Sequence, residues 1–209
     1  MPAARHLITA ALAAAALVVA PAAAHGKTTP HHKTKRPKAT IALGDKRPAK
    51  ARASAITCAN TDVLPTADNV EQIRAAVLCL HNQIRQKNGL PLLKDNAKLR
   101  KAAIGHSADM VDDGYFDHTT PSGTSFVDRI LGAGYAKRNG DWTIGENLAW
   151  GTGDLSTATG VMQAWMNSPG HKANILKRSY KELGIGIRLG TPNDVGVGAT
   201  FSAEFGAKS

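Results

Sequence analysis

The sequence has no apolar stretch long enough to cross a membrane, only two cysteines, and no internal repeat. Its one apolar run, residues 7–20, falls short of the roughly 20 residues that a spanning helix needs. Two cysteines alone cannot make a metal site. The metalloprotease motif His-Glu-x-x-His does not occur. These absences exclude a multi-spanning membrane protein, a cysteine-ligated zinc domain and a zinc protease of that class.

The N-terminus has the three parts of a secretory signal. Arg5 and His6 precede the apolar run, Pro21 ends it, and the small residues Ala22–Ala24 follow. A charged start, a short apolar centre and an Ala-x-Ala exit are typical of a cleaved signal peptide. We therefore predict a signal peptide over residues 1–24, with an uncleaved anchor or a buried helix as the alternatives.

Positive charge is concentrated in residues 25–55. This segment has nine Lys and Arg against the single acid Asp45, whereas residues 56–209 have 16 basic and 15 acidic residues. With almost no large apolar side chains it cannot offset the entropy lost on ordering, so we predict a disordered basic linker. It is either a plain spacer or an adhesive for an anionic envelope surface. We expect no nucleic-acid partner, because the chain is exported and the domain shows no basic face in sequence.

Cys58 and Cys79 are an even number of cysteines in a chain predicted to leave the cytoplasm. Such a compartment favours a disulfide, which would tie the segment entering the domain to its first helix. Two buried free thiols are the alternative.

The domain, residues 56–209, shows helical periodicity first and strand periodicity later. A capping box formed by Asp68 and Glu71 predicts the start of a helix that Gly89 ends. Apolar spacing predicts further helices over 96–113, from 125 to 132, and over 156–167. Alternation over 183–189 and 195–201 predicts an antiparallel hairpin, and 143–150 a further strand. Helices grouped early and strands late favour an α+β fold.

The histidines fall into two groups. His81 and His106 lie within predicted helices and are interpreted as surface or core residues. His118 follows a helix end, and His171 lies where Ser-Pro-Gly breaks the fourth helix. Glu146 stands among glycine and apolar residues, where a carboxylate is either paired or functional.

Three segments together resemble the CAP superfamily, the cysteine-rich secretory, antigen five and pathogenesis-related proteins, also called the SCP-like extracellular domain. They are 116–118 (FDH), 145–149 (GENLA) and 168–176 (SPGHKANIL), in the family's order within a resemblance spanning about 77–206. The form of the third segment resembles the bacterial secreted branch. The resemblance implies an αβα sandwich with a central, mainly antiparallel sheet and a large cleft.

The resemblance also implies a site. His118, His171 and Glu146 would lie on the cleft floor and hold a divalent cation, and these three are also the candidate catalytic residues. Asn147 and Ser168 would line the same cleft, with Ser168 standing where many relatives have a second glutamate. Glu182 is the candidate replacement. Two imidazoles with one or two carboxylates suit Zn²⁺.

Two functions of different classes remain open from the sequence. The first is a secreted or cell-wall-associated binding module whose cleft takes a lipid-like or cell-wall ligand. The second is an extracellular hydrolase that uses metal-bound water or Glu146 as a general base. No serine or cysteine nucleophile lies in an activating motif, which favours binding.

Overall fold

The computed structural model describes residues 54–208, so the predicted signal peptide and nearly all of the predicted linker lie outside the described residues. The chain forms helices α1 (Val70–Lys87), α2 (Ala97–Asp112), α3 (Phe126–Gly132), α4 (Ala158–Asn167) and α5 (Pro169–Leu176). Its strands are β1 (Lys94–Asp95), β2 (Trp142–Thr152), β3 (Glu182–Leu189) and β4 (Gly198–Lys208). A 3₁₀ turn, η1 (Gly153–Ser156), joins β2 to α4.

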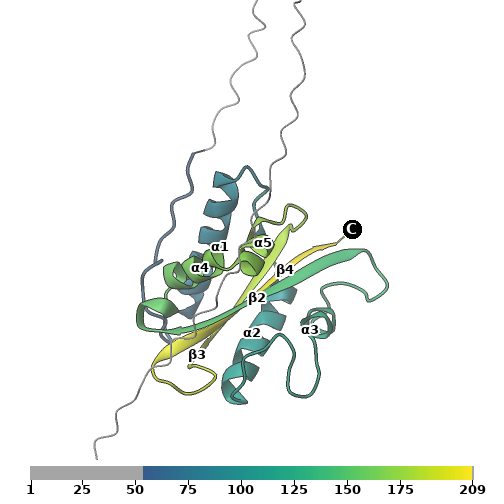
Figure 1. Cartoon of the computed structure of the whole chain (residues 1–209). Coiled ribbons are helices and arrows are strands. Elements are labelled where there is room, and N and C mark those ends of the chain that lie inside the picture. The colour runs from purple at the N-terminus through teal and green to yellow at the C-terminus, as the bar shows by residue number, and fades with distance from the viewer. Residues whose placement is uncertain (1–53, 209) are drawn as a thin grey trace, which may run out of the picture. The chain divides into compact units, whose positions relative to one another are not determined.

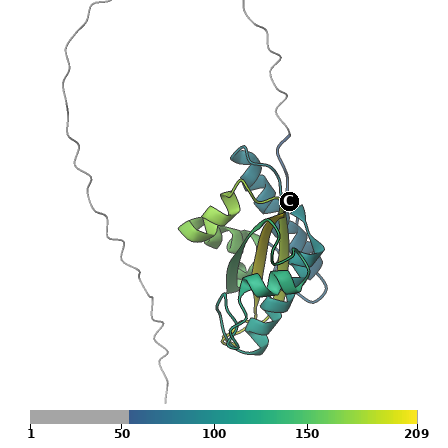
Figure 2. The same cartoon turned by 90° about the vertical axis from the view of Figure 1, so that its right-hand side faces the viewer.

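The strands form one sheet in the order β1-β3-β4-β2 (Figure 1). β4 pairs antiparallel with β3 and with β2, and the short β1 pairs parallel with β3. Helices lie on both sides of this sheet (Figure 2), which confirms the predicted α+β class.

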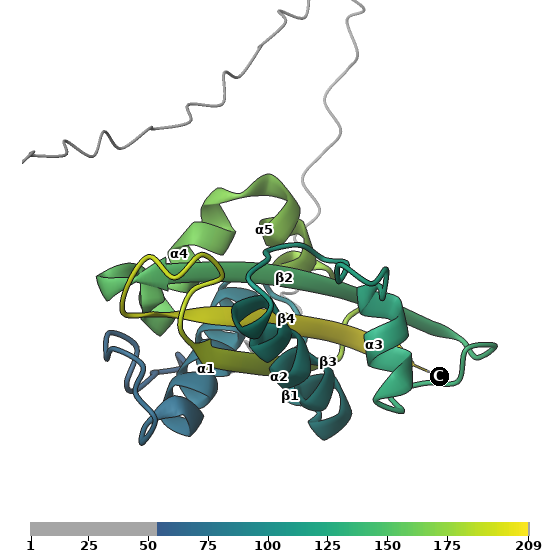
Figure 3. The same cartoon turned by 90° about the horizontal axis from the view of Figure 1, so that it is seen from below.

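One face of the sheet carries most of the apolar core. Leu183, Ile185, Phe201 and Phe205 alternate along β3 and β4 and pack against helices α1, α4 and α5. Trp165 on α4 is buried in this core and donates its indole N–H to the Leu148 carbonyl at 2.9 Å. Figure 3 shows α4 and α5 alongside β2.

The opposite face is covered by α2 and α3 and is more polar. At Gly184 and Gly186 of β3, an added Cβ would lie 2.1 Å from backbone atoms of α2. The helix therefore packs directly on the strand, and only glycine permits that approach. The β4 residues on this face include Ser202 and Glu204, both fully buried.

Several element boundaries differ from the sequence predictions. Asn69 occupies the cap position of α1 without a side-chain cap bond, so the capping box at Asp68 does not form. The capping box of α3 does form, between Ser125 and Asp128. The second hairpin strand begins at Gly198, which leaves Val197 94% exposed in the connecting loop. Residues 169–176 form the separate helix α5, and β1 was not predicted.

The predicted disulfide is confirmed: Cys58 and Cys79 are bonded and tie the entering segment to α1. Ile56 extends this attachment, since its backbone N–H donates to the Gln86 side chain at 3.0 Å and its carbonyl accepts from Gln83 at 2.9 Å. Across the described part of the chain, no helix has the length and apolar content to cross a bilayer.

Candidate functional site

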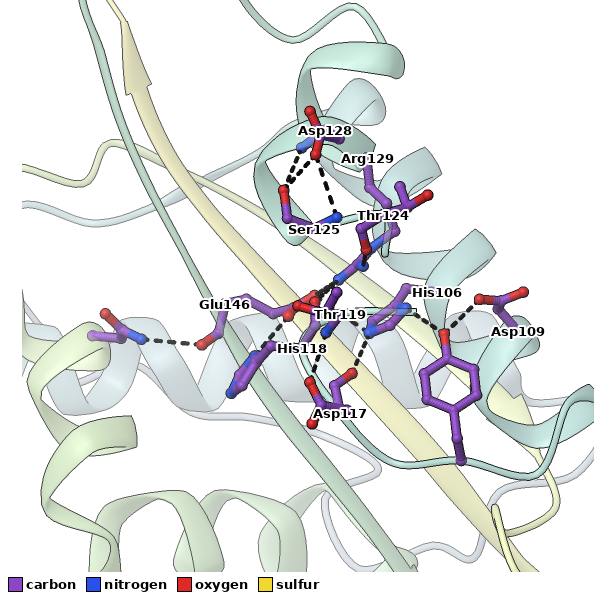
Figure 4. Close-up of polar contacts among 12 residues, drawn as sticks. His106, Asp109, Asp117, His118, Thr119, Thr124, Ser125, Asp128, Arg129 and Glu146 are labelled. Carbon is purple, nitrogen blue, oxygen red and sulfur yellow. Dashed lines mark hydrogen bonds and ion pairs between the residues drawn. The ribbon is translucent and has the colours of Figure 1, made fainter. Parts of the chain in front are cut away.

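The candidate site is built around the carboxylate of Glu146, whose side chain is fully buried on β2. One oxygen accepts from Nδ1 of His118 at 2.7 Å, and the other from the guanidinium of Arg129 on α3, also at 2.7 Å (Figure 4). The same guanidinium donates to the main-chain carbonyls of His118 and Thr124. Arg129 thus fixes both the carboxylate and the loop that carries His118.

A second buried carboxylate lies beside the first. Glu204 on β4 is the cross-strand partner of Glu146, so the two side chains project from the same face of the sheet. Neither oxygen of Glu204 meets an N–H or O–H donor among the described residues. Burial and the neighbouring Glu146 charge raise the pKa of Glu204 well above its usual value, which favours its protonated form.

Glu146 itself stays ionised. Burial acts to raise its pKa, but the hydrogen bond from His118 and the charge of Arg129 bring the pKa below its ordinary value. The bond to Glu146 raises the pKa of His118, although burial acts against it. The pair is therefore an imidazolium on a carboxylate at mildly acidic pH.

A third imidazole supports the cluster from α2. His106 is fully buried, and its Nε2 donates to the main-chain carbonyl of Asp117 at 3.0 Å. The hydroxyl oxygen of Tyr115 lies 3.3 Å from Nδ1 of His106, and the hydroxyl donates a hydrogen bond to the Asp109 carboxylate at 2.5 Å. Burial lowers the pKa of His106, so it is a neutral neighbour of Glu146 at 3.8 Å. His106 holds the loop just before His118.

His171 lies in the first turn of α5, close enough to His118 for that residue's charge to act on it. Burial, and then the His118 charge, lower its pKa. Its main-chain carbonyl accepts from the Asn147 amide at 3.0 Å, and Asn174 bridges Asn147 and the Glu146 carbonyl. Successive side chains of β2 point to opposite faces of the sheet. Glu146 therefore contacts Arg129 on α3, while Asn147 bonds to the start of α5.

The other two residues predicted to line the cleft lie apart from this contact network. Ser168 is the cap residue between α4 and α5, without a side-chain cap bond. Glu182 accepts from Asn96 at 2.8 Å and from the Tyr135 hydroxyl at 2.6 Å. Glu182 therefore belongs to a separate pair of hydrogen bonds at the start of β3.

The arrangement does not fit a divalent cation as it stands. Among residues 54–208, no three His, Cys, Asp or Glu side chains are grouped to hold a metal ion. Both oxygens of Glu146 already have donors, and one donor is a permanent cation, Arg129. The zinc site of His118, Glu146 and His171 stays a prediction.

The hollow next to this cluster is small. It has a volume of about 230 Å³ between α2 and α3 and is lined in part by Lys101, His106 and Arg129. Binding sites for drug-sized ligands usually measure roughly 300–1,000 Å³. The ring of His118 instead faces outward, with 52% of its side chain exposed.

A sequence profile of the cysteine-rich secretory protein family, CAP, matches residues 78–202. The chain belongs to the CAP family. The CAP domain here is similar to "Uncharacterized protein YkwD" of Bacillus subtilis, with 37% identity over 138 residues, which are 66% of this chain and 50% of that protein. A membrane protein of the same species, YlbC, is 35% identical over 53% of this chain and 30% of its own length. The chain thus spans half or less of these relatives.

Solved structures agree with the fold. An extracellular protein with an SCP domain from Bacillus anthracis shares 30% identity at a TM-score of 0.53, over 68% of this chain and 43% of that one. An outer surface protein from Borrelia burgdorferi shares the fold at 22% identity and a TM-score of 0.55, over 70% of this chain and 97% of that one. These neighbours are described as extracellular or outer-surface proteins.

Sequence reasoning missed two members of the CAP site. Arg129 lies on a seven-residue helix, too short for its periodicity to show which side chains face inward. Glu204 stands between Ala203 and Phe205 in a strand that is buried on both faces. An acid in such a strand is the signal that could have marked it, since buried carboxylates need a partner.

Proposed function

We propose that this chain is an exported protein whose CAP domain binds a cell-envelope ligand at the surface formed by His118 and His171. One observation carries this proposal: both oxygens of Glu146 are already held by His118 and Arg129. A carboxylate in that state positions its neighbours and is poorly placed to take a proton from a substrate. The cluster therefore holds an exposed imidazole in a fixed orientation.

The same residues indicate which ligand groups this surface accepts. His118 uses Nδ1 on Glu146 and leaves the rest of its half-exposed ring available, with the imidazolium charge favoured by that bond. A carboxylate or phosphate on the ligand would complement this charge. Such groups occur on cell-wall fragments and on lipid head groups. The hollow beside Arg129 has a volume of only about 230 Å³, which leaves little room for a buried acyl chain and favours the cell-wall fragment.

The test is binding of soluble muropeptides to the purified chain, followed by calorimetry. We expect His118→Ala and His171→Ala each to weaken binding about tenfold or more, the loss of one charge-assisted hydrogen bond of roughly 1.5–3 kcal/mol. His81→Ala is an unsuitable control because His81 lies in the core. His31→Ala, in the predicted linker, is the control and should leave binding unchanged. Equal binding by wild type and both site variants would reject the proposal.

A second candidate, an extracellular hydrolase, is favoured by one observation. The environments of Glu146 and Glu204 move their two pKa values in opposite directions, a pattern common to acid–base pairs in enzymes. Against it, both cysteines of the domain are in the disulfide and no serine donates to His118. Turnover of fluorogenic peptides or glycans that is abolished by Glu146→Gln would favour this alternative.

A further inference from the structure

Two adjoining hollows lie at the end of the sheet where β2 begins and β4 ends. Their volumes are about 490 Å³ and 400 Å³, and both are lined by Asp141 and Lys208. The two hollows adjoin because Trp142, the first residue of β2, pairs with Lys208, the last residue of β4. Figures 1 and 3 show these two strand ends side by side. We call the pair of depressions the lysine hollow.

Lysines from four separate parts of the chain meet here. Lys98 lies in the first turn of α2, Lys137 in the loop before β2, Lys181 just before β3 and Lys208 at the end of β4. A fifth ammonium, that of Lys177, contacts the hydroxyl of Thr143 at 3.2 Å on the wall. Because these residues are far apart in sequence, the expectation of a domain without a basic face missed them.

The positive charge of the lysine hollow is largely uncompensated. The ion pairs found among residues 54–208 all use arginine or histidine, and none uses a lysine. One carboxylate, Asp141, lines the hollow. Glu182, next to Lys181, accepts only from the neutral donors Asn96 and Tyr135, so the four lysines that line the hollow face two carboxylates. A concave surface with one sign of charge attracts the opposite charge more strongly than a flat one.

The hollow also presents one aromatic side chain, that of Trp142, while the ring of Tyr135 is buried beneath it. The indole N–H of Trp142 donates to the Lys137 carbonyl at 3.1 Å, which fixes the ring in the wall. The ammonium of Lys208 lies 4.6 Å from the centre of the Tyr135 ring and donates to the Tyr135 carbonyl at 2.8 Å. An aromatic face offers apolar contact to the C–H groups of a sugar ring. The large exposed apolar residues of the described chain lie outside the hollow, so nothing here would insert into a lipid surface.

We propose that the lysine hollow binds a negatively charged glycan, with its lysines taking carboxylate or phosphate groups and Trp142 contacting a sugar ring. The volume suits one or two sugar units of a longer chain. This site is distinct from the His118–His171 surface and does not depend on the function proposed for it. It adds an anchoring surface on the folded domain to the basic segment of residues 25–55.

The first experiment maps lysine acylation in the full-length chain by mass spectrometry, with and without tetragalacturonate. A short ligand is used because a long polymer could also bind the basic segment. We expect acylation of Lys98, Lys137 and Lys181 to slow at least threefold, while Lys87 and Lys172, which do not line the hollow, react unchanged. Protection confined to lysines of residues 25–55 would overturn the proposal.

The second experiment compares two double variants that remove equal charge. Lys98→Gln/Lys137→Gln should weaken tetragalacturonate binding about tenfold at low salt, whereas Lys87→Gln/Lys172→Gln should weaken it less than about twofold. All four side chains are exposed, so both variants should keep the wild-type unfolding temperature. Equal weakening by both would show a diffuse charge effect and no site.

Two further ligands complete the test. Neutral maltotetraose should give no protection, because the proposal depends on negative groups. Vesicles of phosphatidylglycerol should protect the hollow lysines less than the glycan does. Stronger protection by vesicles, or equal protection by maltotetraose, would remove the assignment to an anionic glycan.

Discussion

Glu146 and Glu204 face each other across β2 and β4, two fully buried carboxyl side chains that pair in the antiparallel register. Only one guanidinium, that of Arg129, is bonded to this pair among the described residues. Two adjacent carboxylates cannot both ionise at low cost, so one keeps its proton. The directions of the two pKa values assign the negative charge to Glu146 and the proton to Glu204.

The first prediction concerns the pH dependence of stability at Glu204. Its folded-state pKa is raised, so its contribution is fully present below the unfolded pKa, near 4.3, and is lost as the pH rises towards the folded value. Glu204→Gln cannot ionise but can still donate to Glu146. We expect the variant to be more stable than wild type at pH 8 by about 1 kcal/mol or more, with a smaller difference at pH 4.5, in urea unfolding.

The matched control for this prediction is Glu71→Gln on the exposed side of α1. Its carboxylate is 80% exposed and its ion pair with Arg74 is worth about 1 kcal/mol or less, so the variant should stay within about that amount of wild type and keep the wild-type pH profile. A Glu204→Gln variant that is less stable than wild type at every pH would show that the ionised carboxylate is required in the fold.

The second prediction concerns Arg129. Arg129→Met leaves the buried Glu146 charge without its cation and frees the carbonyls of His118 and Thr124. Removing one partner of a buried pair costs roughly 3–5 kcal/mol, and we expect thermal unfolding to show a loss of that size. Arg138→Met is the control, since its exposed pair with Asp128 is worth about 1 kcal/mol or less. Similar losses in both variants would contradict the role given to Arg129.

The third prediction assigns the histidine titrations. In NMR titration, the pKa of His118 should lie above 6.5 and that of His171 below it, while that of buried His81 should be about 4. His118→Gln should raise the pKa of His171, because part of its lowering comes from the His118 charge. An unchanged His171 titration in that variant would mean that the two rings do not interact.

The predictions from sequence succeeded where local chemistry decides the structure. Asn96 caps α2 with bonds to Lys98 and Leu99, and Ser125 caps α3, as the residue types predict. The predicted antiparallel hairpin forms between β3 and β4, but its second strand begins at Gly198 and excludes Val195 and Val197, whose alternation with glycine resembles that of a strand. They lie instead in a loop where Asp194 and Gly196 take positive φ angles of 50° and 120°.

The residues of the site likewise divide into those that the sequence predicted and those that it missed. The contact between His118 and Glu146 follows from the family motifs, because those motifs encode positions across the fold. The inward orientation of Arg129 and Glu204 could not be predicted. A helix as short as α3 and a strand buried on both faces, such as β4, have no periodicity that shows which side chains point into the site. His81, for which the sequence left a surface and a core position open, is buried beside Trp165 and Phe205.

The fourth prediction tests zinc. Because Arg129 and His118 already occupy the oxygens of Glu146, we expect 1 mM Zn²⁺ (roughly a hundredfold above a 10 µM dissociation constant) to leave the unfolding temperature of the domain unchanged within about 1 °C at pH 7.5. A site of that affinity would contribute about 2.7 kcal/mol, which thermal unfolding detects easily. A shift that disappears in both His118→Ala and His171→Ala would establish the predicted site, and one that survives both would place the metal elsewhere, for instance at His31 and His32.

The fifth prediction concerns Arg85, a fully buried guanidinium on α1 that bonds to carbonyl groups alone. It donates to Ile175 and Lys177 at the end of α5, to Tyr180 and to Pro91, at distances of 2.8–3.1 Å. One side chain thus donates to four main-chain carbonyls, of which that of Lys177 also accepts from the Tyr180 N–H at 3.3 Å. It links α1 to the C-terminal end of the helix that carries His171.

Arg85→Met keeps much of the apolar length but leaves the carbonyls of Pro91, Ile175 and Tyr180 without this donor, while that of Lys177 keeps the Tyr180 N–H. At about 1–3 kcal/mol for each buried acceptor, partly relieved by water, we expect a loss of about 3 kcal/mol in urea unfolding. Arg85→Lys should recover only part of it, because an ammonium cannot span the four positions that the planar fork reaches. Arg178→Met, an exposed neighbour with one long bond to Gly89 at 3.3 Å, should cost less than about 0.5 kcal/mol.

Hydrogen exchange locates the effect: amides of 171–180 should exchange faster in Arg85→Met, while those of α2 stay protected. Uniform acceleration over the domain would indicate a general loss of stability and no specific link between α1 and α5.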